Sequence, residues 1–189
     1  MRLLRRRAVF LDRDGVIVRS IVRDGKPYAA RRLEDFRLLP GARAAISSLK
    51  NAGLWVVVVT NQPDIANGLV PERVVATMHA RLRSELVIDD IRMCPHNSAA
   101  GCGCRKPKPG LLLKAAANYN IDLPKSYMVG DRISDVLAGS SAGCQSIFID
   151  RRYAESVGKN IGTEMIVQSL PGAARLILSL IAKRQSIGF

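Results

Sequence analysis

Aromatic residues and long apolar runs are scarce in this chain. Phe, Trp and Tyr make up 5% of its 189 residues, which argues against a stacking platform for single-stranded nucleic acid. The longest uninterrupted apolar run, Leu54 to Val59, is far shorter than the roughly 20 residues that span a bilayer. Only Ala8–Leu11 separates the basic start from Asp12, so we expect no secretory signal. These features predict a cytoplasmic protein without a membrane partner.

Acidic residues are also few. Asp and Glu number 16 against 29 Lys and Arg, which gives a formal net charge of +13. Such an excess favours an anionic partner, either nucleic acid or a phosphorylated small molecule. A solubilising, arginine-rich surface accounts for the same excess, so the charge alone leaves the two readings open.

Short apolar runs alternate with helical patterns along the chain. Strands are predicted at Ala8–Leu11, Leu54–Thr60, Val87–Met93, Tyr127–Val129 and Gln145–Ile149. Helices are predicted from Pro40-Gly41 to Gly53, after Pro71 with Val74, Val75, Met78 and Leu82 as the buried stripe, and over Gly110–Tyr119, Ile133–Ala142 and Ala173–Lys183. This order predicts an α/β, Rossmann-like doubly wound fold, with a mostly parallel sheet covered by helices on both faces. We expect one domain over 1–189, with a motif-bearing core at about 8–150 and a partly helical 151–189.

Polar residues follow three of the predicted strands. Asp12 and Asp14 come after the first, Thr60 ends the second, and Asp131 follows Tyr127–Val129. Each alone is compatible with a solvated turn, but ligands bind at the carboxyl ends of strands in such sheets. Together the carboxylates suit Mg²⁺, and Thr60 with Lys106 complements the oxygens of a phosphoryl group.

Three of the four cysteines lie close together with a histidine. Cys94, His96, Cys102 and Cys104 have the spacing C-x-H-x5-C-x-C, which fits a closed, structural zinc site. Reduced cysteines without metal are the alternative. Cys144 stands apart, and we expect it to be a small buried hydrophobe.

Four ordered motifs carry a family resemblance. Phe-Leu-Asp12-Arg-Asp14-Gly-Val, Thr60-Asn-Gln, Lys106-Pro-Lys-Pro-Gly and Gly130-Asp131-Arg-Ile-Ser-Asp135 resemble the motifs of the haloacid dehalogenase (HAD) superfamily of phosphohydrolases. The Cys/His insert is similar to that of its zinc-bearing branch, which has a small zinc-stapled loop and no large cap domain. The resemblance implies removal of the 7-phosphate of D-glycero-D-manno-heptose 1,7-bisphosphate, in the biosynthesis of nucleotide-activated heptose. Histidinol phosphate is the alternative substrate.

The resemblance also implies roles for individual residues. Asp12 is the expected nucleophile, and Asp14 the expected general acid and base. Mg²⁺ is expected on Asp12, the backbone carbonyl of Asp14, and Asp131, with Asp135 orienting Lys106 or a metal-bound water. Thr60 and Lys106 are expected to hold the phosphoryl oxygens. The expected substrate-binding residues are Ser20 and Arg23 of the loop 20–23, Asn61, Gln62, Pro63, Arg105 and Lys106.

The chain departs from the family pattern after Thr60. Relatives typically read Thr-Asn-Gln-Ser-Gly-Ile-Ala-Arg-Gly, whereas this chain has Pro63, Asp64 and Asn67. Pro63 lacks a backbone N–H, and Asp64 adds negative charge near the predicted phosphate site. We expect these changes to affect substrate preference, including the anomer at C1, and not hydrolysis itself.

Two further readings, of which only the second is from another class of protein, compete with a sugar phosphatase. One is a nucleic-acid 3′-phosphatase, because an open site admits larger substrates. The other is a basic, zinc-containing nucleic-acid-binding module, which leaves the four aspartates unexplained. We expect a phosphorylated sugar as the partner, no nucleic acid, and a monomer. His79 has no visible partner in the sequence, so we expect it at the surface or in satisfied packing.

Overall fold

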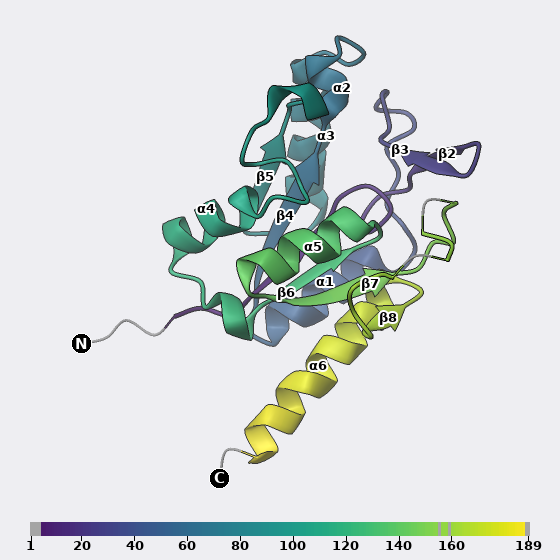
Figure 1. The fold of residues 1–189 in the computed structure, drawn as a ribbon. Coiled ribbons are helices and arrows are strands. Elements are labelled where there is room, and N and C mark those ends of the chain that lie inside the picture. Colours follow the sequence, from purple (N-terminus) through teal and green to yellow (C-terminus); the bar gives the residue numbers. More distant parts are fainter. Residues whose placement is uncertain (1–4, 155, 159, 188–189) are drawn as a thin grey trace.

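The centre of the protein is a six-stranded sheet, shown in Figure 1 as a computed structural model that describes residues 5–154, 156–158 and 160–187. The strand order is β5-β4-β1-β6-β7-β8, and every neighbouring pair is parallel. The strands are β1 (Ala8–Leu11), β4 (Trp55–Asn61), β5 (Asp90–Cys94), β6 (Tyr127–Gly130), β7 (Gln145–Ile149) and β8 (Ile166–Val167). The predicted parallel α/β fold is therefore confirmed.

Helices cover both faces of the sheet (Figure 1). One face carries α1 (Ala42–Asn51), α3 (Glu72–Glu85) and α6 (Leu170–Ile187). The other carries α4 (Gly110–Tyr119) and α5 (Ile133–Ala142). Three single-turn helices complete the described helices: α2 (Pro63–Ala66), η1 (Ser98–Ala100) and η2 (Leu123–Lys125).

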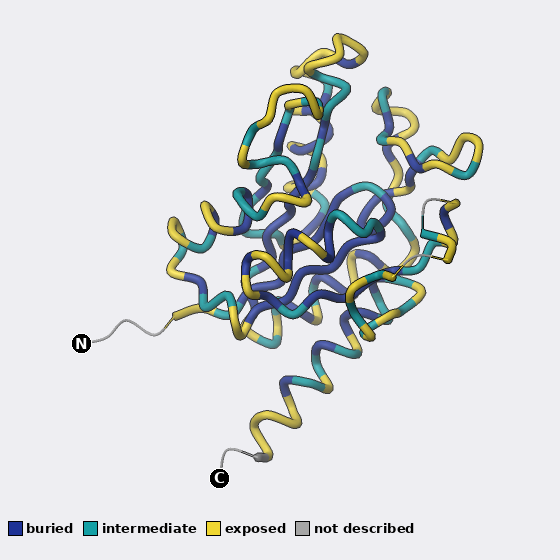
Figure 2. Tube along the Cα trace, viewed as in Figure 1, coloured by how far each residue is buried: buried dark blue, intermediate teal, exposed yellow. Residues whose placement is uncertain are grey.

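Alternate side chains of each central strand enter different cores. Val9 and Leu11 of β1 pack with α1, α3 and α6, whereas Ala8 and Phe10 pack with α4 and α5. The four valines of β4 divide in the same way, and all are fully buried (Figure 2). Each such valine stabilises the fold by about 1.5–3 kcal/mol. The doubly covered sheet therefore explains why these strands are apolar throughout.

The predicted start of β5 and the predicted buried stripe of α3 were wrong in detail. β5 begins at Asp90 rather than Val87, whose side chain is 54% exposed. The residue before the strand is Asp89. Its Oδ2 accepts a hydrogen bond from the Val56 N–H at 2.7 Å, so a side-chain oxygen takes the place of a backbone partner there and strand pairing starts one residue later. Val74 is half-buried at the margin of the core and does not belong to the fully buried stripe of α3.

The sequence analysis missed a β-hairpin. β2 (Ile21–Arg23) and β3 (Lys26–Tyr28) pair antiparallel, so the predicted loop 20–23 is largely a strand. Asp24 and Gly25 form its turn with φ of 50° and 70°, the left-handed conformation that a two-residue Asp-Gly hairpin turn requires. The hairpin projects beyond the carboxyl ends of the central strands (Figure 1), where the candidate site lies.

The C-terminal region adds a strand and a long helix. β8 extends the sheet by pairing with β7, and α6 is longer at both ends than the predicted 173–183. Ala173, Ala174 and Ile177 bury one side of α6 in the core that α1 shares, while its far end projects from the body (Figure 1). Among the described helices, none combines the length and apolarity needed to cross a bilayer.

Candidate active site

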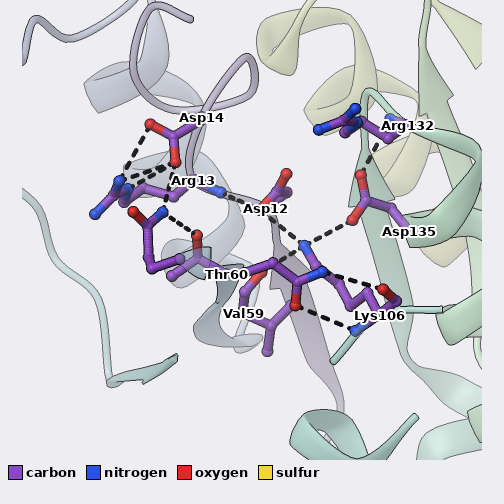
Figure 3. A network of polar contacts seen from close by, with 10 residues as sticks. Asp12, Arg13, Asp14, Val59, Thr60, Lys106, Arg132 and Asp135 are labelled. Carbon is purple, nitrogen blue, oxygen red and sulfur yellow. Dashed lines mark hydrogen bonds and ion pairs between the residues drawn. The ribbon is translucent and has the colours of Figure 1, made fainter. Parts of the chain in front are cut away.

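The centre of the site is an ion-paired lysine at the carboxyl edge of the sheet (Figure 3). Lys106 Nζ lies 2.8 Å from Asp12 Oδ1 and 2.6 Å from Asp135 Oδ1, and it donates to the Val59 carbonyl at 2.8 Å. The lysine is 4% exposed and both aspartates are buried. Although burial alone would lower the pKa of Lys106, Asp12 and Asp135 raise it above its ordinary value, so the ammonium stays charged.

Asn61 fixes the loop that carries this lysine. Its Nδ2 donates to the Lys106 carbonyl and its Oδ1 accepts from the Lys106 N–H, each at 3.1 Å. Because Asn61 is the last residue of β4, this pair of bonds ties the loop to the sheet edge. Arg105, the preceding residue, donates from Nη1 to the His96 carbonyl at 3.2 Å.

Three carboxylates meet beside Lys106. Asp12, Asp131 and Asp135 each place an oxygen within 4.8 Å of the others. Burial raises the pKa of Asp131 well above its ordinary value, and Asp12 and Asp135 raise it further. Burial likewise raises the pKa of Asp135 to about 6 against the opposing effect of Lys106. A hydrogen bond from the Tyr153 hydroxyl and the charge of Lys106 act in the opposite direction and lower the pKa of Asp131.

Glycine at position 15 permits this close approach. Gly15 has φ of 83°, and a Cβ there would lie 1.7 Å from Asp131 Oδ2 and 2.9 Å from the Tyr153 hydroxyl. No other residue type fits against the carboxylate at that distance. The Asp14-Gly15 sequence after β1 thus allows the chain to turn directly over the carboxylate of Asp131, the residue that follows β6.

Asp14 lies outside the carboxylate group. Its Oδ2 accepts from Arg13 Nε at 3.0 Å and from Gln62 Nε2 at 2.9 Å, and Gln62 also donates to Thr60 Oγ1 at 2.9 Å. Burial raises the pKa of Asp14, and the neighbouring Arg13 opposes that rise. Asp14 and Thr60 are therefore connected through one amide (Figure 3).

His79 is buried and has a partner, as the packing alternative predicted. Its Nε2 lies 3.0 Å from Arg13 Nη1. Burial, with Arg13 and then Arg83, lowers the pKa of His79 to about 3, so the ring is neutral at ordinary pH. His79 reaches the site through Arg13 and is absent from the lining of the cavity described next.

A cavity of about 820 Å³ opens at this edge of the sheet. The predicted residues that line it are Asp12, Asp14, Ser20, Thr60, Asn61, Pro63, Arg105, Lys106, Asp131 and Asp135. Two predicted substrate-binding residues are placed elsewhere. Gln62 is buried behind Thr60, and Arg23 lines a second cavity of about 510 Å³ with Arg31 and Arg32.

The unusual Asp64 is ion-paired. Arg31 Nε donates to Asp64 Oδ2 at 2.7 Å, and this contact raises the pKa of Arg31. The pair joins the segment after the hairpin to α2, where Pro63 occupies the first turn. Asp64 therefore brings a compensated charge to the cavity wall.

The Cys/His cluster is assembled as a closed group. Sγ of Cys94, Cys102 and Cys104 and a ring nitrogen of His96 all lie within 4.8 Å of one another. The sulfur–sulfur distances are 3.2, 3.5 and 3.6 Å, close to the ~3.8 Å edge of a tetrahedron with zinc–sulfur bonds of about 2.3 Å. All four cysteines are free thiols, and Cys144 is buried, as expected. The cluster suits a structural zinc ion.

The sequence analysis missed several residues at the site. Arg13 is fully buried beneath Asp14, although its place in the Asp-Arg-Asp-Gly motif could have identified it. Lys26 lines the main cavity from the hairpin, which the Asp24-Gly25 turn could have revealed. Tyr153, which follows β7, comes close to Asp131 and Gly15, and no local sequence pattern predicts that contact.

The parallel sheet with paired aspartates and a lysine at its carboxyl edge defines a HAD-like phosphohydrolase. The HAD-hydrolase-like family model matches residues 103–170. D-glycero-β-D-manno-heptose-1,7-bisphosphate 7-phosphatase from Pseudomonas aeruginosa is 40% identical over 182 residues, which cover 92% of this chain and 98% of that protein. The α-anomer enzyme from Mycobacterium tuberculosis strain H37Rv is 38% identical over 152 residues, covering 75% and 78%.

Solved structures agree with these relatives. The crystal structure of D,D-heptose 1,7-bisphosphate phosphatase from B. bronchiseptica, complexed with magnesium and phosphate, has a TM-score of 0.78 and 32% identity, covering 92% of this chain and 99% of that one. The enzyme from Burkholderia thailandensis has a TM-score of 0.64 and 27% identity, covering 92% and 99%. The chain belongs to the HAD-like hydrolases, in the family of D-glycero-D-manno-heptose-1,7-bisphosphate 7-phosphatases, and is a phosphatase.

Proposed function

We propose that this phosphatase removes the 7-phosphate of D-glycero-D-manno-heptose 1,7-bisphosphate through a covalent intermediate on Asp12. The observation that carries the proposal is the buried Asp12–Lys106 pair, 2.8 Å apart, which lines a cavity of about 820 Å³. Its place at the carboxyl edge of a parallel sheet is where α/β enzymes bind ligands. The relatives' names supply the substrate.

Asp12 acts first. A carboxylate oxygen attacks phosphorus in line. The bond between phosphorus and the oxygen on C7 breaks, and its electron pair leaves on that sugar oxygen. Lys106 is charged and within 2.8 Å of Asp12, so it stabilises the negative charge on the phosphoryl oxygens as the bond breaks. Thr60, buried at the end of β4, offers its hydroxyl to the same oxygens.

Asp14 moves the protons. It gives a proton to the departing sugar oxygen, then takes one from the water that attacks phosphorus in the aspartyl-phosphate. That attack breaks the bond to Asp12, releases inorganic phosphate and restores the free carboxylate. Asp14 lines the cavity but stands apart from Asp12, Asp131 and Asp135, as separate acid–base and nucleophilic roles require.

The residues at the sheet edge fit a divalent cation. Asp12, Asp131 and Asp135 against Lys106 leave a formal charge of about −2, which one divalent ion neutralises. Asp131 is 1% exposed, and Tyr153 is its one neutral hydrogen-bond partner among the described residues, so its buried charge needs a cation. Asp12, Asp131 and the Asp14 carbonyl would hold Mg²⁺, which neutralises the charge of the transferring phosphoryl group when bound. Asp135, paired with Lys106 at 2.6 Å, orients the lysine.

The remaining predicted residues shape the pocket. Ser20, Asn61, Pro63 and Arg105 line the cavity and would contact the sugar or its phosphates. A zinc ion on the Cys/His cluster would hold the loop that leads directly into Arg105 and Lys106. The cluster supports this structural role because its four ligand atoms leave no open position for water.

The test is steady-state phosphate release with Mg²⁺ from both anomers of the heptose bisphosphate, histidinol phosphate and a 3′-phosphorylated oligonucleotide. We expect a heptose anomer to exceed histidinol phosphate at least tenfold in kcat/KM. A higher value for histidinol phosphate or the oligonucleotide would overturn the substrate assignment.

A further inference from the structure

Arg13 is a fully buried arginine that connects Asp14, in the segment after β1, with His79 on α3. Its guanidinium contacts Asp14 through Nε at 3.0 Å and Nη2 at 2.9 Å, and His79 through Nη1 at 3.0 Å. It also lies over the Phe36 ring, 5.3 Å from the ring centroid. Burying a guanidinium costs free energy unless its donors are matched, so these contacts hold it in one place.

The direction of the Arg13–His79 bond follows from the chemistry of the two groups. An arginine only donates, so His79 Nε2 accepts, and the ring carries its proton on Nδ1. His79 is anchored in turn, because it lies on α3 between Met78 and Leu82, which are buried in the core. The position of Arg13 is therefore fixed by a helix outside the carboxylate group.

This arrangement treats the two oxygens of Asp14 differently. Oδ2 accepts hydrogen bonds from Arg13 Nε at 3.0 Å and Gln62 Nε2 at 2.9 Å, and it also forms an ion pair with Arg13 Nη2 at 2.9 Å. Oδ1 has a single longer contact, from Arg13 Nη2 at 3.3 Å. Oδ2 is therefore the more firmly held oxygen, and Oδ1 keeps the greater freedom to exchange a proton.

We propose that Arg13, held by His79, is a positioning residue that anchors Oδ2 of Asp14 and so aims Oδ1 at the leaving-group oxygen. The inference rests on the proposed function, in which Asp14 protonates the departing sugar oxygen. The proton passes from Oδ1 to that oxygen as the phosphorus–oxygen bond breaks. Misplacing Asp14 therefore harms substrates whose leaving group needs a proton.

Two His79 variants separate positioning from general packing. His79→Leu removes the acceptor of Arg13 Nη1, whereas His79→Gln keeps an oxygen acceptor at a similar reach. The readout is kcat/KM on heptose bisphosphate, whose alkoxide must be protonated, and on p-nitrophenyl phosphate, whose nitrophenolate leaves unaided. For His79→Leu we expect a loss of about tenfold or more on the bisphosphate and less than about threefold on the nitrophenyl ester. His79→Gln restores the bisphosphate activity.

Equal losses on both substrates would overturn the proposal, as would a His79→Gln enzyme impaired like His79→Leu. Thermal melting by circular dichroism reports folding. If His79→Leu does not fold, Arg13→Lys keeps the charge but loses the fork, and the same selective loss is expected of it. If the wild type does not hydrolyse the bisphosphate, the proposed substrate fails. The positioning claim is then decided on histidinol phosphate, whose leaving oxygen also needs a proton.

Discussion

At the scale of the residue, Lys106 balances the charge of the site. It is almost completely buried and within 2.8 Å of two carboxylates that carry opposite charge. A buried pair of this kind adds little net stability when intact, but the loss of one partner leaves an uncompensated charge. The same ammonium is positioned to bind phosphoryl oxygens, so its removal should be visible in both stability and activity.

We predict that Lys106→Met lowers the free energy of unfolding by about 3–5 kcal/mol and kcat/KM by at least about 100-fold. Asp12 and Asp135 would then repel each other without a cation between them. Urea denaturation and phosphate release measure the two effects. Lys114→Met, on the exposed surface of α4, is the matched control. A Lys106→Met protein as stable as that control would contradict the account.

His79 gives a pH-dependent stability term. Burial lowers its pKa to about 3 in the folded protein, whereas an unfolded histidine has about 6.5. The unfolded state therefore binds the proton more readily below about pH 6.5, and stability is lost as the pH falls from there toward 3. Between pH 8 and pH 5 the loss is about 2 kcal/mol.

The measurement is the difference in unfolding free energy between the wild type and His79→Gln across that range. Carboxylates that titrate in both proteins cancel in the difference. The wild type should lose about 2 kcal/mol relative to the variant. Parallel stability curves would show that folding does not lower the pKa of His79, which would contradict a buried ring that accepts from Arg13 at Nε2.

At the scale of the element, the central strands could be predicted because both faces of the sheet are covered. Such strands are apolar at every position, as in the four valines of β4, and the polar residues that follow them mark the ligand edge. The hairpin was predictable in principle from Asp24-Gly25. β8 was not, because the two residues Ile166–Val167 gain strand structure only by pairing with β7.

The motif residues could be predicted, but their partners could not. Asp12, Lys106 and Asp135 lie far apart in the sequence, and only the parallel packing of β1, β4 and β6 brings their strand ends together. The Arg13–His79 contact joins residues 66 positions apart across the packing of α3. Periodicity predicted that His79 lies on a helix, yet it contains no information about which buried group the ring meets.

The Cys/His cluster is expected to bind zinc and thereby to hold the loop before Arg105 and Lys106. We expect one zinc ion per chain by native mass spectrometry, and its loss in Cys102→Ser. Because the loop leads into Arg105 and Lys106, kcat/KM should fall by about 10- to 100-fold. Cys144→Ala, outside the cluster, should retain zinc and is the matched control. A zinc-free Cys102→Ser enzyme with wild-type kinetics would show that the metal does not position the lysine.

At the scale of the whole molecule, the fold gathers one site from segments spread over most of the chain. β1, β4 and β6 deliver Asp12, Thr60 and Asp131 to one edge, and the hairpin adds Lys26, with Ser20 directly before it, to the cavity wall. The chain carries a net charge of +13, whereas several carboxylates line its main cavity. This combination suits a multiply phosphorylated small molecule that approaches through a positive field and reacts at a metal-dependent centre.

The most direct measurement traps the covalent intermediate. Heptose bisphosphate labelled at the 7-phosphate is mixed with the enzyme and Mg²⁺, quenched in acid within milliseconds, and the peptides are mapped by mass spectrometry. The account predicts phosphate on the peptide that contains Asp12, with no phosphopeptide and at least a 1,000-fold loss of turnover (a ~4 kcal/mol higher barrier) in Asp12→Asn. Substantial phosphate release by Asp12→Asn, or a label on another residue, would contradict it.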